Sequence, residues 1–399
     1  MNKNESSKIR IVYYDEGAHG WTQVGGSQLA RLDLMQRLDP EYFSPLLLTS
    51  QDKELAAAAR DKDIQVEVTP ILDNNYFRFS REKLLQSPSH LLKTIKQAFL
   101  GGKRLAGKLK QFNAQIVHPN DNLSRTITLC SQMWYKVPSV MHIDGEWNKG
   151  FADVIMRNLF YYRFDSLIAV SGRVAEIVDG KGDETQKISL INTGRDYSKF
   201  RDADIYKIRN ELDIDYNSFI IATIGKLIDH KGQYLALQAL AECKRKKILS
   251  NFIYLLVGDG PDKTELWDYA KELGISDQVC FTGVRTDVPD IMAAVDCVLQ
   301  PSLTEAFPLV LVESLMAARY VISTDVGGAS EILDNGRYGT LVPAGDTHAI
   351  VDAVKELLEM DPEYRERIIK EGQKRAVENY SIENAVKKTE QLYYSLIGK

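Results

Sequence analysis

The chain has 399 residues, of which 44% are hydrophobic and 26% are charged, which is typical of a globular protein with a full core. Its length predicts two or three domains, and its net charge of −5 excludes a protein that binds nucleic acid through an overall basic surface. The four cysteines form no C-x-x-C pair, so we expect reduced core thiols in a cytosolic protein.

We expect neither a signal peptide nor a membrane-spanning helix in this sequence. The apolar run near the N-terminus is too short for a signal peptide, and no stretch reaches the roughly 18 apolar residues that a membrane-spanning helix requires. We therefore expect a cytoplasmic protein.

The first half of the chain alternates predicted strands and helices. Residues 8–14 read as a buried parallel strand, a glycine-containing loop with Gly25 and Gly26 follows, and residues 28–38 have helical periodicity. Such a loop can bring backbone amides against a phosphate. The alternative is a strand-to-helix loop that needs glycine only for its turn. The G-x-G-x-x-G fingerprint of dinucleotide-binding proteins is absent. The other predicted elements of this half are strands at 44–50, 64–68, 115–118, 137–142, 166–171 and 187–192 and a helix at 52–62.

Residues 78–111 form a basic segment with helical apolar spacing, which we expect to be interrupted near Gly101 and Gly102. Glu82 is its one acidic residue, against nine basic ones: Arg78, Arg81, Lys83, Lys93, Lys96, Lys103, Arg104, Lys108 and Lys110. A helix of this kind can lie on an anionic membrane surface. The alternative is an ordinary domain helix whose basic face is solvated.

Two successive predicted strands end in histidine followed by a polar loop, at His118 and at His142. Ligands of open α/β sheets gather outside the carboxyl ends of the strands. His142 and Asp144 are therefore candidate site residues, although a single histidine is more often structural.

The second half repeats the alternation after a predicted domain boundary at 194–200. Its predicted strands are 219–225, 252–257, 279–283, 296–300, 320–324 and 340–343, and its helices include 233–243, 347–359, 364–379 and 381–397. Two runs of alternating strands and helices predict two doubly wound α/β domains. Lys226 and Lys231 follow one strand end, and two such point charges match a pyrophosphate, whereas each lysine alone could be a solvated surface residue.

Residues 299–333 contain the most specific pattern, in which Glu305 and Glu313 are separated by seven residues. Pro308 suits the first turn of the helix that follows, and a helix N-terminus favours an anionic ligand. Two hydroxyl acceptors around an anion site suit a nucleotide sugar. The alternative is a surface helix with two solvated glutamates.

In these stretches the chain resembles the retaining family-4 glycosyltransferases of the GT-B fold, the glycosyl transferases group 1. The matching segments are GKLIDHKG at 225–232, LVGDGP at 256–261, FTGVRTDV at 281–288, TEAFPLVLVE at 304–313, GGASEIL at 327–333 and, in the first half, INTGRDYSKF at 191–200. The resemblance implies two Rossmann-like domains that face each other across a cleft. Residues 1–195 would form the acceptor domain and 196–380 the donor domain, with a helix at 381–399 that returns to the first.

The resemblance also implies a role for each candidate residue. Lys226 and Lys231 would hold the donor diphosphate after Gly225, Glu305 would contact the transferred sugar, and Glu313 would contact the ribose. The remaining contacts would come from the amides of Phe307, Leu309 and Val310, from Val284 and Arg285 beside the base, from Gly25 and Gly26, and from His142 near the sugar. The family commonly has arginine where Lys226 stands.

These features predict a metal-independent, retaining hexosyltransferase that uses a nucleotide sugar, preferably a UDP-sugar, as substrate and needs no cofactor. The expected acceptor is a saccharide or a lipid-linked molecule, as in bacterial surface polysaccharide or glycolipid synthesis. The basic segment at 78–111 leaves open a peripheral position on the inner face of the membrane. The alternative is a nucleotide-sugar-binding protein without catalysis, and a dinucleotide-dependent oxidoreductase is disfavoured.

Overall fold

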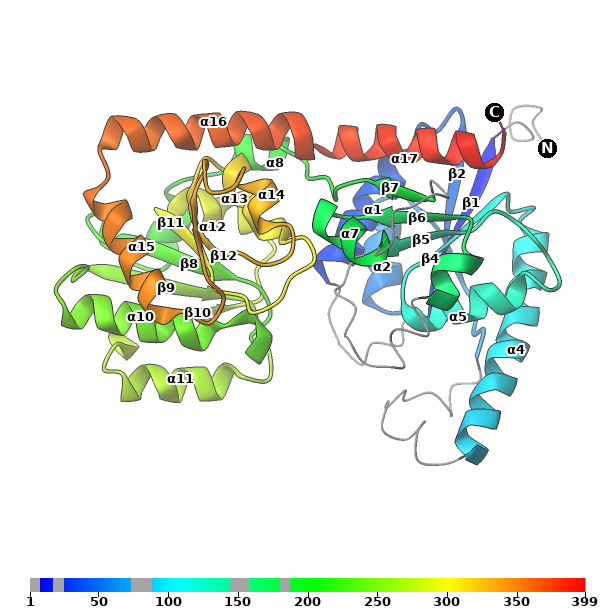
Figure 1. Cartoon of the computed structure of the whole chain (residues 1–399), viewed down its shortest axis with the longest axis horizontal. Helices are drawn as coiled ribbons and strands as arrows, with labels where there is room; N and C mark the ends of the chain where they lie inside the picture. Colours follow the sequence, from blue (N-terminus) through cyan, green and yellow to red (C-terminus); the bar gives the residue numbers. More distant parts are fainter. Residues whose placement is uncertain (1–7, 17–24, 73–87, 144–157, 180–186, 399) are drawn as a thin grey trace. The chain divides into compact units, whose positions relative to one another are not determined.

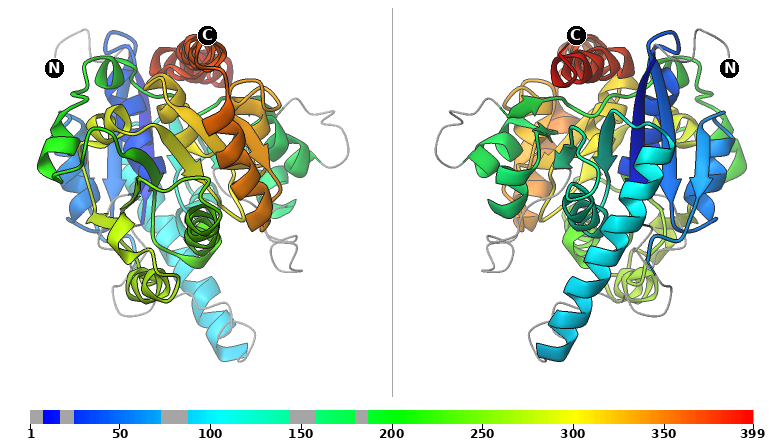
Figure 2. Two further views of the ribbon diagram at one scale, coloured as in Figure 1. Left: turned by 90° about the vertical axis from the view of Figure 1, so that its left-hand side faces the viewer. Right: turned by 90° about the vertical axis from the view of Figure 1, so that its right-hand side faces the viewer.

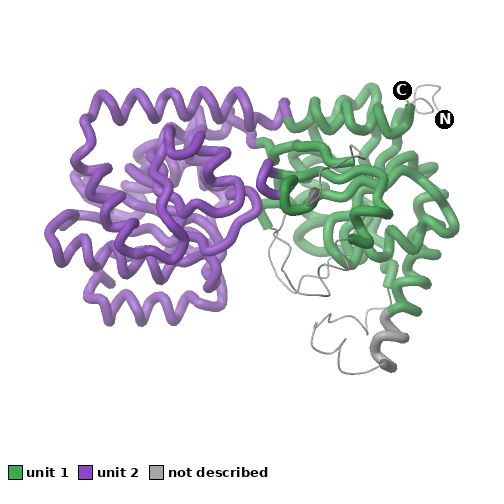
Figure 3. Tube along the Cα trace, viewed as in Figure 1, with its two compact units in different colours: residues 1–170, 175–194, 385–399 green, residues 171–174, 195–384 purple. Residues whose placement is uncertain are grey.

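The computed structural model describes residues 8–16, 25–72, 88–143, 158–179 and 187–398. The chain divides into two compact units (Figure 3). Unit 1 comprises residues 1–170, 175–194 and 385–399, and unit 2 comprises residues 171–174 and 195–384. Both units contain parallel sheets with helices packed against them, so the predicted α/β class with two parallel-sheet domains is confirmed (Figure 1).

Unit 1 is built around a parallel sheet with the strand order β3-β2-β1-β4 and a second one with the order β5-β6-β7. A parallel bridge between Val117 and Ser139 connects the two. The elements are β1 (Ile9–Asp15), α1 (Gly26–Arg37), β2 (Phe43–Thr49), α2 (Glu54–Arg60), β3 (Gln65–Val68), α4 (Pro88–Gln111), β4 (Ile116–Pro119), α5 (Asn122–Ser131), β5 (Val140–Ile143), β6 (Ser166–Ala169), α7 (Gly172–Asp179) and β7 (Ile188–Leu190). The first residues of α7, up to Val174, belong to unit 2.

The expected interruption at Gly101 and Gly102 is wrong, because α4 runs through both residues. Both glycines permit close packing of the helix. A Cβ atom on Gly102 would lie 2.5 Å from the Cβ atom of Cys130, and one on Gly101 would lie 2.8 Å from Leu72. The two residues therefore allow α4 to approach α5, and the gain from that packing offsets the low helix propensity of glycine.

Unit 2 contains a six-stranded parallel sheet with the order β10-β9-β8-β11-β12-β13. Its elements are α8 (Ser198–Arg201), α9 (Lys207–Glu211), β8 (Phe219–Ile224), η1 (Asp229–Lys231), α10 (Gln233–Arg245), β9 (Phe252–Val257), α11 (Lys263–Glu272), η2 (Ser276–Gln278), β10 (Val279–Gly283), α12 (Val288–Ala294), β11 (Cys297–Gln300), α13 (Leu309–Met316), β12 (Tyr320–Thr324), α14 (Ala329–Ile332), β13 (Thr340–Val342), α15 (Thr347–Glu359) and α16 (Pro362–Tyr380). The last helix, α17 (Ile382–Leu396), begins in unit 2, and its residues from Ala385 onward belong to unit 1.

The core of unit 2 explains why these segments form strands and helices. Apolar side chains on one face of the sheet, among them Ile221, Tyr254 and Leu299, pack against α10, α11 and α15. Each buried aliphatic or aromatic side chain contributes roughly 1.5–3 kcal/mol to folding. Helices α12 and α13 lie on the other side of the sheet, as the views in Figures 1 and 2 show.

The strand order of unit 2 predicts where a ligand binds. If its six strands are numbered from one to six along the chain, they lie side by side in the order 3-2-1-4-5-6, so the direction in which strands are added reverses between β8 and β11. Ligands of such sheets bind in the crevice at this switch point, beyond the carboxyl ends of the strands. Strand β8 ends at Ile224 and β11 ends at Gln300, directly before the predicted lysines and Glu305 respectively.

Candidate active site

Glu305 lies in the loop between β11 and α13, and three donors hold one of its oxygens. Oε1 accepts hydrogen bonds from Lys231 Nζ at 2.6 Å, from Ser302 Oγ at 2.9 Å and from Gln300 Nε2 at 3.0 Å. The glutamate side chain is 12% exposed and the lysine side chain 21%. Because all three donors converge on Oε1, the carboxylate is fixed in orientation and Oε2 remains to accept hydrogen bonds from a ligand.

Two glycines allow the backbone around Glu305 and Lys231 to pack closely. Gly327 has a φ of +55°, and a Cβ atom there would lie 2.2 Å from the carbonyl oxygen of Glu305. Gly232 has a φ of +69°, and a Cβ atom there would lie 2.0 Å from the carbonyl oxygen of Pro301. Residues with side chains cannot occupy either position without displacing the loop that carries Glu305.

Lys226 lies on the loop after β8, beside Lys231. Partial burial and the neighbouring positive charge of Lys231 lower the pKa of the Lys226 ammonium group. Two ammonium groups that repel each other at the end of a parallel sheet form a site in which a bound anion relieves the repulsion. The nearby N-terminus of α13, where Pro308 is the capping residue, adds backbone amides without helical partners.

Glu313 lies within α13, and its carboxylate is oriented by a residue that the sequence reasoning did not select. Arg195 Nε donates to Glu313 Oε1 at 2.6 Å, and the two side chains are 11% and 18% exposed. Arg195 lies in the INTGRDYSKF segment, so the resemblance indicated the segment but not the role of this arginine. Ser302 and Gln300 were missed as well, although both lie at the end of β11, where ligand-binding residues are expected.

Phe307 and Val310 are buried at the start of α13, and the ring of Phe307 packs against that of Tyr380, with 5.7 Å between the ring centroids. Leu309 is the first residue of the helix. The structure thus brings Glu305, Lys231, Phe307, Leu309 and Val310 together at one end of the sheet.

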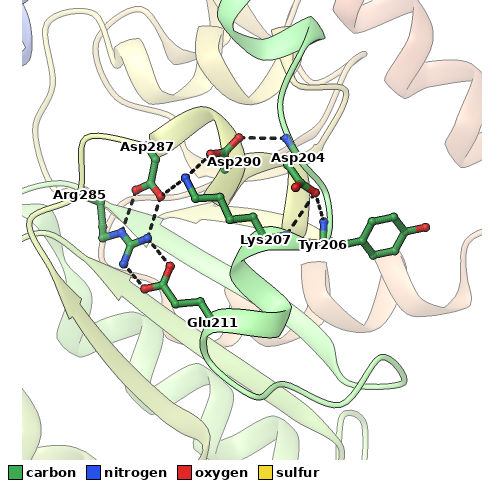
Figure 4. Close-up of polar contacts among 7 residues, drawn as sticks. All are labelled: Asp204, Tyr206, Lys207, Glu211, Arg285, Asp287 and Asp290. Carbon is green, nitrogen blue, oxygen red and sulfur yellow. Dashed lines mark hydrogen bonds and ion pairs between the residues drawn. The ribbon is translucent and has the colours of Figure 1, made fainter.

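Val284 and Arg285 follow β10, and the structure gives them different environments. Val284 is 52% exposed. The guanidinium group of Arg285 is held by two carboxylates, those of Glu211 on α9 and Asp287 (Figure 4). Both ion pairs raise the pKa of Arg285, and Lys207 joins the cluster through Asp287 and Asp290. Arg285 therefore fixes this loop to α9, and what the loop can offer a nucleotide is its backbone and Val284.

In unit 1, Gly25 and Gly26 begin α1, and the amide of Gly25 donates to the side chain of Gln28 at 3.0 Å. His142 is the third residue of β5 and is 9% exposed. Burial, together with the positive charges of Arg31 and Arg125, lowers the pKa of His142 well below its usual range, so the imidazole is neutral. Asp144 lies outside the described residues, as do residues 78–87 of the basic segment.

The strand ends of unit 1 also carry buried acids. Glu16 follows β1, accepts a hydrogen bond from the hydroxyl of Tyr14, and its amide donates to Asp121 Oδ2 at 3.2 Å. Burial is the main cause that raises the pKa of Glu16 to about 7. The strand order β3-β2-β1-β4 reverses its direction between β1 and β4, so these acids lie at the switch point of the unit 1 sheet.

Comparison with known families gives one match, to the family described as Glycosyl transferases group 1, over residues 204–375. Among curated proteins, the chain is 30% identical over 192 residues to an alpha-D-kanosaminyltransferase of Streptomyces kanamyceticus, which covers 47% of this chain and 49% of that protein. It is 34% identical over 143 residues to an N-acetyl-alpha-D-glucosaminyl L-malate synthase of Bacillus anthracis, covering 36% and 37% of the two chains. The chain thus spans about half or less of the length of these relatives.

Solved structures match over nearly the whole chain. The crystal structure of Anabaena Alr3699/HepE in complex with UDP-glucose superposes with a TM-score of 0.79 at 21% identity, covering 97% of this chain and all of that one. The structure of WaaG, a glycosyltransferase involved in lipopolysaccharide biosynthesis, has a TM-score of 0.67 at 17% identity and covers 94% and 98% of the two chains. At these identities the likeness is one of fold, and the fold is GT-B.

Proposed function

We propose that the chain belongs to the glycosyl transferases group 1 family, whose model matches residues 204–375, and that it is a retaining hexosyltransferase with a nucleotide diphosphate sugar as donor. The observation that carries the proposal is the fixed Glu305 carboxylate beside the paired Lys226 and Lys231 at the switch point of unit 2. A binding site with a free acceptor oxygen next to two ammonium groups suits a ligand in which a sugar follows a pyrophosphate. UDP is the preferred nucleotide, since UDP and UDP-glucose are bound in the similar Anabaena structures.

Each residue of unit 2 then has a distinct task. Lys226, Lys231 and the N-terminal amides of α13 bind the diphosphate and stabilise the charge that it gains as it leaves. Oε2 of Glu305 accepts hydrogen bonds from sugar hydroxyls, and Glu313, oriented by Arg195, accepts those of the ribose. The backbone at Val284 lies beside the base.

The transfer breaks the bond between the anomeric carbon and the β-phosphate oxygen, and the electron pair leaves with the diphosphate. The acceptor hydroxyl forms its bond to the same face of the anomeric carbon and gives its proton to the departing phosphate. His142 contacts the sugar in this scheme. The configuration at the anomeric carbon is retained, and the lysines supply the positive charge that a metal ion would otherwise provide.

The acceptor that we propose is a lipid-linked saccharide or glycolipid at an anionic membrane surface. The C-terminal part of α4 packs in the core through Leu105 and Leu109. Farther toward its N-terminus the same helix exposes Ile95 and Phe99, which are 57% and 44% exposed, and the ring of Phe99 contacts that of Trp134 at 4.6 Å. Apolar side chains next to the basic residues of this helix suit the interface of an anionic bilayer. Among the described residues, no helix has the length and apolar character of a membrane span.

The test is a nucleotide-release assay with UDP-, GDP- and ADP-sugars, with and without a bacterial lipid extract as the source of acceptor. We expect one donor to give release, and we expect Lys231→Ala to lower kcat/KM by roughly a hundredfold, as the loss of one electrostatic contact to a leaving group does. Lys355→Ala, at an exposed lysine of α15, is the matched control. UDP binding without turnover from any donor, with the extract present, would instead support a nucleotide-sugar-binding protein.

A further inference from the structure

A chain of hydrogen bonds runs through the interior of unit 1 to His142. The hydroxyls of Tyr13 and Tyr393 are 2.6 Å apart, and the hydroxyl of Tyr393 is 2.9 Å from Nδ1 of His118. Nε2 of His118 is 2.9 Å from Nδ1 of His142, and the two imidazole planes lie within 10° of each other. Tyr13, His118 and Tyr393 are 0% exposed. The members come from β1, β4, β5 and α17, so four separate segments of the chain build this connection.

The protons in this chain can be arranged in two directions. In the first, Tyr13 donates to Tyr393, Tyr393 donates to His118 Nδ1, and His118 Nε2–H donates to His142 Nδ1. The proton of neutral His142 is then on Nε2. In the second, every bond is reversed: His142 Nδ1–H donates to His118, and Tyr393 donates to Tyr13. Nε2 of His142 then has no proton.

The two directions differ at Tyr13. In the first direction all the hydroxyl and ring protons inside the chain have acceptors. In the second, the hydroxyl proton of Tyr13 needs another acceptor, and within the described residues the Tyr13 hydroxyl bonds only to Tyr393. A buried donor without an acceptor is costly enough to favour the first direction by roughly tenfold or more.

The surroundings of His142 keep its imidazole neutral, so the remaining question is which ring nitrogen has the proton. The guanidinium group of Arg125 donates to the carbonyl oxygen of His142, and burial, together with the cations of Arg31 and Arg125, opposes protonation of the ring. A neutral imidazole carries one proton, and since Nδ1 faces His118, Nε2 is the nitrogen that can meet a ligand.

We propose that His118 and Tyr393 are positioning residues that hold His142 as the Nε2–H tautomer, so that His142 donates a hydrogen bond to an oxygen of the transferred sugar and does not act as a base. The inference rests on the proposed function for the placement of the sugar beside His142. The tautomer itself depends only on the hydrogen bonds described above.

The tautomer can be measured directly by long-range ¹H–¹⁵N correlation spectra of protein labelled with ¹⁵N-histidine. The chain has six histidines, and the spectra of His118→Gln and His142→Gln assign the relevant signals. We expect Nε2 of His142 to have the shift of a protonated nitrogen and Nδ1 that of an unprotonated one. A protonated Nδ1 in the wild-type spectrum would overturn the proposal, whatever the enzymatic activity.

Two tyrosine variants provide a matched pair. Tyr393→Phe removes the hydroxyl that bonds to His118 Nδ1, so the bias is lost and both tautomers of His142 become populated. In Tyr13→Phe, Tyr393 still donates to His118, so the wild-type tautomer persists. Each variant removes one buried hydroxyl, and only the first should change the spectrum of His142. Equal spectra for the two variants would contradict the relay.

Kinetics then connect the tautomer with the sugar. We expect Tyr393→Phe to lower kcat/KM for the donor by about twofold to tenfold, and Tyr13→Phe to leave it unchanged. The Kd of UDP, which lacks the transferred sugar that would contact His142, should be the same in both variants. A parallel change in UDP affinity would show a general structural effect and overturn the positioning role. Absence of turnover in the wild type would refute the proposed function but not the tautomer assignment.

Discussion

Glu16 makes the stability of unit 1 depend on pH in a way that can be worked out from its surroundings. The side chain is 6% exposed and the carboxylate of Asp121 lies nearby. Burial first, and then the charge of Asp121, outweigh the hydrogen bonds from Tyr14 and Ser50 and raise the pKa of Glu16 from 4.5 to about 7. The folded state therefore binds the proton more tightly than the unfolded state.

The sign follows from that difference. Below pH 4.5 Glu16 is protonated in both states, and its contribution to stability is fully present. As the pH rises to about 7, the unfolded state ionises while the folded state resists, so the free energy of unfolding falls. Above pH 7 the loss is complete. A shift of about 2.5 pKa units corresponds to a loss of about 3 kcal/mol.

The assay compares urea denaturation of the wild type and Glu16→Gln at pH 5 and pH 8. Glutamine cannot ionise and can still accept a hydrogen bond from Tyr14, so the variant should gain about 2 to 3 kcal/mol relative to the wild type between the two pH values. Glu54→Gln, at an exposed glutamate of α2, should show no such gain. An equal pH dependence for Glu16→Gln and the wild type would refute the reasoning.

Two further predictions concern other parts of the chain. Arg195→Lys removes the Nε–H group that donates to Glu313 and should raise the KM for the nucleotide sugar roughly tenfold in the release assay. Arg201→Lys, at an exposed ion pair of α8, should leave this KM unchanged. An unchanged KM in Arg195→Lys would show that Arg195 is not part of the site. Ile95→Asp should weaken sedimentation of the protein with anionic liposomes at low salt by severalfold. Ile205→Asp, at a similarly exposed isoleucine, should leave sedimentation unchanged. Equal liposome binding of both variants would show that α4 does not contact the bilayer.

Buried strands were the elements that the sequence predicted best. The strands predicted at 252–257 and 320–324 coincide with β9 and β12, because aromatic, β-branched and other apolar residues in succession, as in FIYLLV and YVI, are typical of a strand buried in a parallel sheet. The break predicted in α4 was wrong because propensity describes a glycine in isolation. The reason that Gly101 and Gly102 remain helical is the neighbouring helix α5, which a local pattern does not reveal.

The candidate site was predicted unevenly for a similar reason. Glu305 and Lys231 follow strand ends, and the strand order brings these ends together, so their meeting could be anticipated from the α/β pattern. The partners that orient the site residues come from distant segments. Arg195 is 118 residues from Glu313, and Tyr393 is 275 residues from His118. No periodicity relates such pairs, so only the folded structure reveals them.

The division of the chain into units has a consequence for its synthesis on the ribosome. Unit 1 begins the chain, but it also includes residues 385–399, which are translated after the whole of unit 2. Until Tyr393 emerges, His118 and Tyr13 lack the hydroxyl that joins them. Domains usually mature in the order in which they are made. Here the unit translated first is completed last, so an incomplete nascent chain contains a finished unit 2 beside a unit 1 that still lacks part of its core.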